Sequence, residues 1–189
     1  MEINEFKVVF LGDIAIGAKT SLIDRIVHDQ FISQAIPTLT VDYAVKTIQT
    51  ELGEISLQLY DTFGDETDRP LIAVFIKEAH CIILGYDVTR RHSFDSIKDS
   101  WYNFVKEKTE RDNVLIYLVG NKIDLYEMRE VSNEEGKSLA NDLNIKFFEV
   151  SAKTGGGVYD LLDDIVNSLI KTFEKSNKTK IALNKYLNY

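Results

Sequence analysis

The chain has 189 residues, 44% of them apolar or aromatic, which is enough for the core of one domain followed by a short tail. The 22 basic and 30 acidic residues give a net charge of −8, which argues against a protein whose whole surface binds nucleic acid. One cysteine, Cys81, excludes an intrachain disulfide framework and a metal site of several cysteines. With no basic signal segment and no apolar run near the ~20 residues of a membrane helix, we expect a cytoplasmic protein.

Short apolar runs alternate with longer amphipathic stretches, which is the pattern of an α/β fold. The apolar runs predict six strands, at 6–11, 40–50, 55–61, 81–86, 114–119 and 147–150. The stretches between them predict helices at 19–30, 67–79, 93–109, 133–142 and 157–173. The second and third strands alternate with period two and are close in sequence, so they predict an antiparallel hairpin. We therefore expect a six-stranded, mostly parallel sheet with helices on both faces.

The composition changes at Glu174, so we divide the chain into a domain at 1–173 and a lysine-containing tail or linker at 174–189. The four lysines of this tail could meet an anionic membrane, but at about 1 kcal/mol each they would not anchor the chain alone. A helix that docks through Ile181, Leu183 and Leu187 is an equal alternative, and the 189 residues could be a piece of a longer protein.

A glycine-containing loop and a Lys-Thr pair follow the first predicted strand, which is the arrangement of a phosphate-binding loop. Its candidate residues are Gly12, Gly17, Ala18, Lys19, Thr20 and Ser21. Backbone amides would surround phosphate oxygens, Lys19 would contact the outer phosphates, and the Thr20 hydroxyl would bind Mg²⁺. In the usual spacing, lysine directly follows the second glycine. Here Ala18 intervenes, either as an extra residue or as a replacement for that glycine in a shifted register.

Two further strand ends carry candidate ligands. Asp61 ends the third predicted strand, where its carboxylate could hold the Mg²⁺ shell through water. After the fifth strand, Asp124 can accept both the ring N–H and the exocyclic amine of guanine, a contact worth about 1–3 kcal/mol of discrimination. Asn121 would join the neighbouring loops, and the Lys122 stem could cover the base.

The last strand is followed by Ser151, Ala152 and Lys153, and the Ala152 amide could contact the base. With these motifs, residues 5–173 resemble the small GTPases of the Ras superfamily, and the Rab branch most closely. The resemblance implies a phosphate-loop small G-domain that binds GTP or GDP with Mg²⁺. Thr38 matches the switch I threonine that senses Mg²⁺ and the terminal phosphate. The resemblance also implies vesicle trafficking, an effector at the switch regions, an exchange factor and a peripheral place at endomembranes.

The chain departs from the family at several of these positions. Asp65, beside Gly64, replaces the glutamine that orients the attacking water, so we expect slow GTP hydrolysis with Gly64 and Asp65 as the catalytic positions. Phe63 replaces an alanine and Thr40 replaces a glycine. No cysteine lies near the end of the sequence, so we expect no prenyl anchor on this chain.

Three functional readings follow. The first is a Rab-like guanine-nucleotide switch with weak hydrolysis. The second is a pseudo-GTPase scaffold with little nucleotide exchange, which the altered phosphate loop favours and Asn121, Asp124 and Ser151 oppose. The third, an ATP-dependent kinase, is disfavoured by the guanine-reading motif. The nucleotide released when the purified protein is denatured distinguishes the three.

Overall fold

The computed structural model describes residues 4–13, 18–32, 41–51, 53–62, 66–110 and 113–186. Six strands form one sheet in the order β2-β3-β1-β4-β5-β6. Their bounds are Asn4–Leu11 (β1), Asp42–Thr50 (β2), Gly53–Asp61 (β3), Cys81–Asp87 (β4), Leu115–Asn121 (β5) and Lys146–Glu149 (β6). β2 runs antiparallel to β3, and the pairs β1–β3, β1–β4, β4–β5 and β5–β6 are parallel. The predicted six-stranded, mostly parallel sheet is confirmed.

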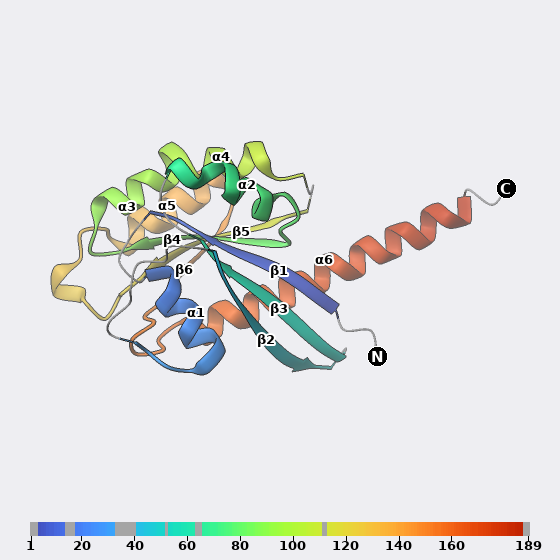
Figure 1. Ribbon diagram of the computed structural model, residues 1–189, viewed down its shortest axis with the longest axis horizontal. Helices are drawn as coiled ribbons and strands as arrows, with labels where there is room; N and C mark the ends of the chain where they lie inside the picture. The colour runs from blue at the N-terminus through green and yellow to red at the C-terminus, as the bar shows by residue number, and fades with distance from the viewer. Residues whose placement is uncertain are drawn as a thin grey trace.

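Helices cover both faces of this sheet. The α-helices are Ala18–His28 (α1), Arg69–Lys77 (α2), Arg91–Ser96 (α3), Tyr102–Lys108 (α4), Asn133–Leu143 (α5) and Val158–Tyr186 (α6). Three short turns complete the set: Glu66–Asp68 (η1), Ile97–Trp101 (η2) and Tyr126–Met128 (η3). α1 and α6 lie on one face, and α2 to α5 lie on the other (Figure 1).

The core consists of two apolar layers, one on each face of the sheet. Along β1, Val8 and Phe10 belong to the layer under α1 and α6, whereas Val9 and Leu11 belong to the layer under α2 to α5. Successive side chains of a strand point to opposite faces, so a strand buried on both faces must be apolar at every position. This is why the parallel strands show continuous apolar runs in the sequence.

Two helices differ from the sequence-based expectation. The stretch expected as one helix at 93–109 is divided into α3, η2 and α4, and η2 is a π-helical turn in which the Tyr102 amide donates to the Ile97 carbonyl. α6 continues past the expected end at 173 to Tyr186 and projects beyond the sheet (Figure 1). The division between domain and tail stays a prediction. Within the described ranges, no helix combines the length and apolar character needed to cross a bilayer.

Candidate functional site

The candidate site lies where the parallel strands end. The registers place Phe10 beside Asp61 and Ile83, and Asp87 beside Asn121, so the carboxyl ends of β1, β3, β4 and β5 meet at one edge of the sheet. Open α/β sheets bind ligands at this edge, because the loops there leave a crevice between successive crossovers. Gly12, Asp61 and Asn121, which the sequence marks as functional, lie at or directly after the ends of β1, β3 and β5.

Lys19 is the residue that the sequence predicts to contact phosphate. From the first turn of α1, its Nζ donates to the carbonyl oxygens of Gly12 at 2.8 Å and Asp13 at 3.0 Å. Burial lowers the pKa of Lys19 to about 8, while the nearby carboxylates of Asp61 and Asp13 act in the opposite direction. The amine is therefore held under the start of the loop, where phosphate oxygens would replace the water that burial removes.

Gly12 turns the chain out of β1 at close range to β4. Its φ is +136°, and a Cβ there would lie 2.1 Å from the carbonyl oxygen of Gly85. Only glycine fits this combination of backbone conformation and close approach. The start of the phosphate loop is thus fixed against the centre of the sheet.

Two of the three candidate Mg²⁺ ligands, Thr20 and Asp61, come together from different elements. The Thr20 hydroxyl in α1 donates to Asp61 Oδ2 at the end of β3, at 2.5 Å. Asp61 is buried, and so is Ser21, which follows Thr20 in the sequence. A hydroxyl and a carboxylate oxygen are ligand types that Mg²⁺ takes in proteins, so this pair fits the ion that the sequence implies.

The loops after β5 and β6, where the sequence predicts that the base binds, are joined by hydrogen bonds. Asn121 Oδ1 accepts the amide hydrogens of Lys122 at 2.7 Å and Ala152 at 3.1 Å, which joins the two loops. Asp124 Oδ1 accepts the Ser151 hydroxyl at 2.6 Å, and Ser151 Oγ in turn accepts the Thr154 amide. Asp124 and Ser151 are 27 residues apart in the sequence and share one hydrogen bond here.

Asp87 is a polar residue of this site that the sequence analysis did not single out. It ends β4 with its side chain fully buried, and Lys122 Nζ lies 2.8 Å from its Oδ2. Its Oδ1 accepts from both the amide and the hydroxyl of Thr89. Lys122, whose φ is +71°, is therefore anchored to β4 as well as to β5. The available signal was a carboxylate ending an apolar strand, as at Asp61.

Arg25, near the end of α1, was missed as well. Its Nε donates to the Ala152 carbonyl at 2.8 Å, and its Nη2 donates to the Lys153 carbonyl at 2.9 Å. The helix that carries Lys19 and Thr20 is thus tied to the loop that carries Ser151 and Ala152. A basic residue in the last turn of a helix was the only sequence signal.

Four predicted positions, Gly17, Thr38, Gly64 and Asp65, lie outside the described residues. Of the others, Ala18 begins α1, and Lys153 contributes its carbonyl oxygen to Arg25. The Ala152 amide is held by Asn121, so its contact with a base stays a prediction.

Comparison with known proteins agrees with this arrangement. Residues 7–171 match the family model described as the Ras family. This chain belongs to the Ras family. It is also 36% identical over 181 residues to the Ras-related protein RabC of Dictyostelium discoideum, an alignment that covers 95% of this chain and 91% of that relative. The resemblance to Rab-like small GTPases is confirmed. Ras-family proteins bind GTP and GDP with Mg²⁺, and the chain is a Rab-like GTP-binding protein by this kinship.

Proposed function

We propose that this chain is a guanine-nucleotide switch of vesicle trafficking that hydrolyses GTP slowly and presents an effector surface beside its switch segments. The proposal rests on two sets of hydrogen bonds in the loops after β5 and β6. Asn121 accepts from the amides of Lys122 and Ala152, and Asp124 accepts from Ser151. These contacts hold one carboxylate in place at the edge where a base would lie, and a carboxylate matches the two donors of guanine.

The roles of the other residues follow from their contacts. Lys19 would contact the outer phosphates, and Thr20 and Asp61 would hold Mg²⁺, directly and through water. Bound Mg²⁺ would supply positive charge to the phosphate groups. Thr38 joins this set by family resemblance. The same resemblance supports a place in the cytoplasm at the surface of endomembranes and an exchange factor that releases GDP.

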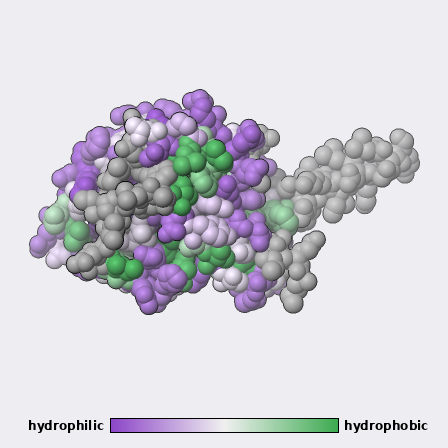
Figure 2. All heavy atoms as spheres, viewed as in Figure 1, coloured by the Kyte–Doolittle hydropathy of each residue, from purple (hydrophilic) through white to green (hydrophobic). Residues whose placement is uncertain are grey.

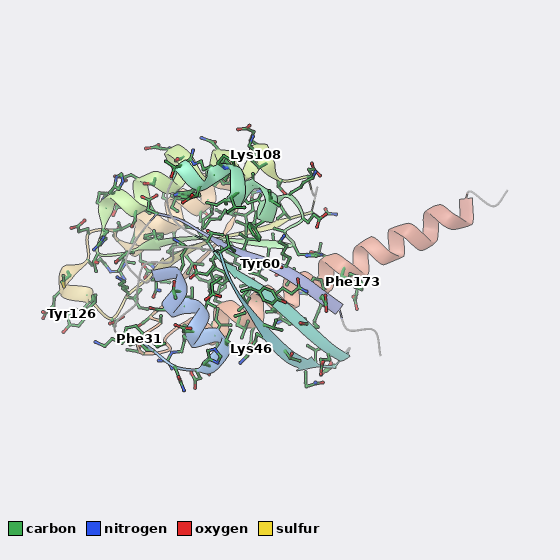
Figure 3. All side chains as sticks on the ribbon, in the orientation of Figure 1. Phe31, Lys46, Tyr60, Lys108, Tyr126 and Phe173 are labelled. Carbon is green, nitrogen blue, oxygen red and sulfur yellow. The ribbon has the colours of Figure 1, made fainter. Side chains whose placement is uncertain are left out.

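An aromatic row supports the effector surface. The rings of Tyr43 in β2, Tyr60 in β3 and Phe75 in α2 touch in series, with centroids 5.1 Å and 5.4 Å apart (Tyr60 is labelled in Figure 3). Exposed apolar side chains flank the row: Val45, Leu71 and Val74, of which Val74 is 64% exposed. Hydrophobic residues stand out among hydrophilic ones on this side of the molecule (Figure 2). Grouped exposed apolar residues mark protein-binding surfaces.

Slow hydrolysis rests on Asp65. A carboxylate near the terminal phosphate has the wrong sign to stabilise the negative charge that gathers there, and it is shorter than the glutamine of the family. Phe63 adds an aromatic ring where the family has a methyl group. We expect Asp65→Gln to raise the single-turnover rate of GTP hydrolysis. A parent rate equal to that of glutamine-containing relatives, or a slower variant, would contradict this part of the proposal.

The decisive experiment identifies the nucleotide released when the purified protein is denatured. GDP or GTP supports the switch, ADP or ATP would indicate the kinase reading, and no nucleotide would favour the pseudo-GTPase reading that the altered phosphate loop supports. The variant Lys19→Ala further distinguishes a nucleotide-dependent switch from a pseudo-GTPase scaffold. A switch should lose affinity for GTP in this variant, whereas a scaffold that does not depend on nucleotide should not change.

Base choice is tested by Asp124→Asn. The new amide should weaken GTP binding by about 1–3 kcal/mol and favour xanthine nucleotides, whose edge presents an acceptor in place of a donor. Asp142→Asn, at an exposed position of α5, is the matched control and should leave both affinities unchanged. Equal GTP affinity in Asp124→Asn and the parent, measured by titration, would remove the claim of guanine recognition.

A further inference from the structure

The side chain of Asp13, at the start of the phosphate loop, is held by a distant part of the chain. Trp101 Nε1 in η2 donates to Asp13 Oδ1 at 2.7 Å, and the Ser96 hydroxyl at the end of α3 donates to Oδ2 at 2.5 Å. The same hydroxyl lies 2.8 Å from the His92 carbonyl, and His92 Nε2 lies 3.6 Å from Asp13 Oδ2. The carboxylate is therefore surrounded by donors from one helical segment.

The tryptophan contact is the firmest of these. Trp101 is fully buried, and an indole N–H can only donate, so a buried indole needs an acceptor. A buried donor without an acceptor costs folding free energy, because its hydrogen bond to water is lost and not replaced. The carboxylate of Asp13 is that acceptor. This one bond gives the buried indole N–H its acceptor and also fixes the Asp13 side chain.

The π-helical turn explains why two donors face one carboxylate. Ser96 and Trp101 are five residues apart, and on a regular α-helix they would point about 140° away from each other, since each residue turns the chain by about 100°. A π-turn bonds residues five apart and brings them to one side of the helix. The amide of Tyr102 bonds the Ile97 carbonyl in this way. The departure from regular helix thus serves the contact with Asp13.

The main chain of the same residue holds the phosphate lysine. The Asp13 carbonyl accepts from Lys19 Nζ at 3.0 Å, beside the Gly12 carbonyl at 2.8 Å. Between Asp13 and Lys19 the sequence departs from the family spacing at Ala18. A fixed Asp13 therefore matters more here, because the lysine that its carbonyl oxygen contacts lies in an altered sequence context.

We propose that Asp13 is a positioning residue, held by Trp101 and Ser96, which fixes the start of the phosphate loop and the Lys19 amine for a bound nucleoside phosphate. This inference rests on the proposed nucleotide-binding function. Asp13 touches Lys19 through its own carbonyl, and it acts on the nucleotide through that lysine. Trp101 also contacts α2: the Arg69 guanidinium lies 5.3 Å from the centre of the Trp101 ring.

The first test needs no nucleotide. Lysine acylation of the nucleotide-free protein, followed residue by residue, should label the Lys19 amine at least ~10-fold faster in Asp13→Ala and in Trp101→Phe than in the parent, because its Nζ would be held less firmly by the Gly12 and Asp13 carbonyl oxygens; ten-fold is about 1.4 kcal/mol. Asp95→Ala, an exposed carboxylate of α3, controls for the lost charge. Phe104→Leu, a neighbour in contact with the Trp101 ring, controls for lost packing. Neither control should change the acylation rate of Lys19.

The second test measures the release of labelled GDP after Mg²⁺ is chelated. Asp13→Ala should release GDP about 10-fold faster than the parent, and Trp101→Phe should also release it faster. The double variant should be no faster than Asp13→Ala, because Asp13→Ala already lacks the bonds to both Trp101 and Ser96. Additive effects in the double variant, or unchanged acylation of Lys19 in Asp13→Ala, would overturn the proposal. Faster acylation without faster GDP release would overturn it too. If the parent binds no guanine nucleotide, the proposed function fails, and the acylation rates alone still decide whether Asp13 positions Lys19.

Discussion

Arg25→Ala should remove the hydrogen bonds that connect α1 to the loop after β6, and so lower the free energy of unfolding. The arginine is nearly buried, with 14% of its side chain exposed, and it donates from α1 to the carbonyl oxygens of Ala152 and Lys153. Alanine keeps the helical propensity of α1 and removes both donors. The loop after β6 would then keep its bond to Asn121 and lose its bonds to the helix that carries Lys19.

The expected magnitude follows from the burial of the two acceptors. Ala152 is buried, so the bond to its carbonyl counts at the full net value of a charged hydrogen bond, about 1.5–3 kcal/mol. Lys153 is exposed, so water can replace the donor there, and we assign about 0.5–1 kcal/mol to that bond. The free energy of unfolding should therefore fall by about 2–4 kcal/mol.

The assay is urea denaturation of the nucleotide-free protein, so that ligand binding does not contribute to the apparent stability. The matched control is Asp29→Asn, because Arg25 also pairs with Asp29 at 3.0 Å, and Asp29 is 65% exposed. Asparagine tolerates the left-handed conformation of this position, where φ is +53°. Asp29→Asn should leave the unfolding free energy unchanged within error. Equal losses in the two variants would refute the assignment of the stabilisation to the loop carbonyls.

Three more outcomes follow from the structure. Gly12→Ala should destabilise the protein by more than ~2 kcal/mol, since its Cβ would meet the Gly85 carbonyl, whereas Gly156→Ala, which meets only the end of a threonine side chain, should melt like the parent. Tyr86→Phe should be neutral or stabilising by up to ~1 kcal/mol in denaturant titration, because the buried Tyr86 hydroxyl finds no hydrogen-bond partner among the described residues; a clear loss would show that the hydroxyl is satisfied. Burial raises the pKa of the Cys81 thiol, so a thiol reagent at pH 8 should react only as the protein unfolds, and equally fast labelling of native and denatured protein would contradict this.

The sheet could be predicted because burial on both faces leaves a direct record in the sequence. A strand such as β4 must be apolar at successive positions. The four residues from Cys81 to Leu84 are all apolar and buried. Asp61, Asn121 and Asp124 could be located for a related reason. Each lies at or just past the end of such a run, where the chain emerges at the edge of the sheet that binds ligands.

The contacts that connect separate elements could not be predicted in this way. Lys122 follows β5 and reaches Asp87 at the end of the neighbouring β4, and Arg25 reaches Ala152 across 127 residues of sequence, so neither pair leaves a local pattern. The π-turn at η2 is equally hidden, because residues 93–109 read as one amphipathic helix. Its geometry depends on where Trp101 packs and on which acceptor its indole finds.

The central place of β1 has a consequence for how the protein is made. β1 leaves the ribosome before the other five strands of the sheet, yet its partners are β3 and β4, and its first residue pairs with Ile55. The apolar layer that contains Phe10 is completed by residues of α6 as late as Leu169. Contacts this far apart in sequence form slowly. β1 must therefore wait for β3 and β4, which end at Asp61 and Asp87, and the domain cannot complete its core before α6 has been synthesised.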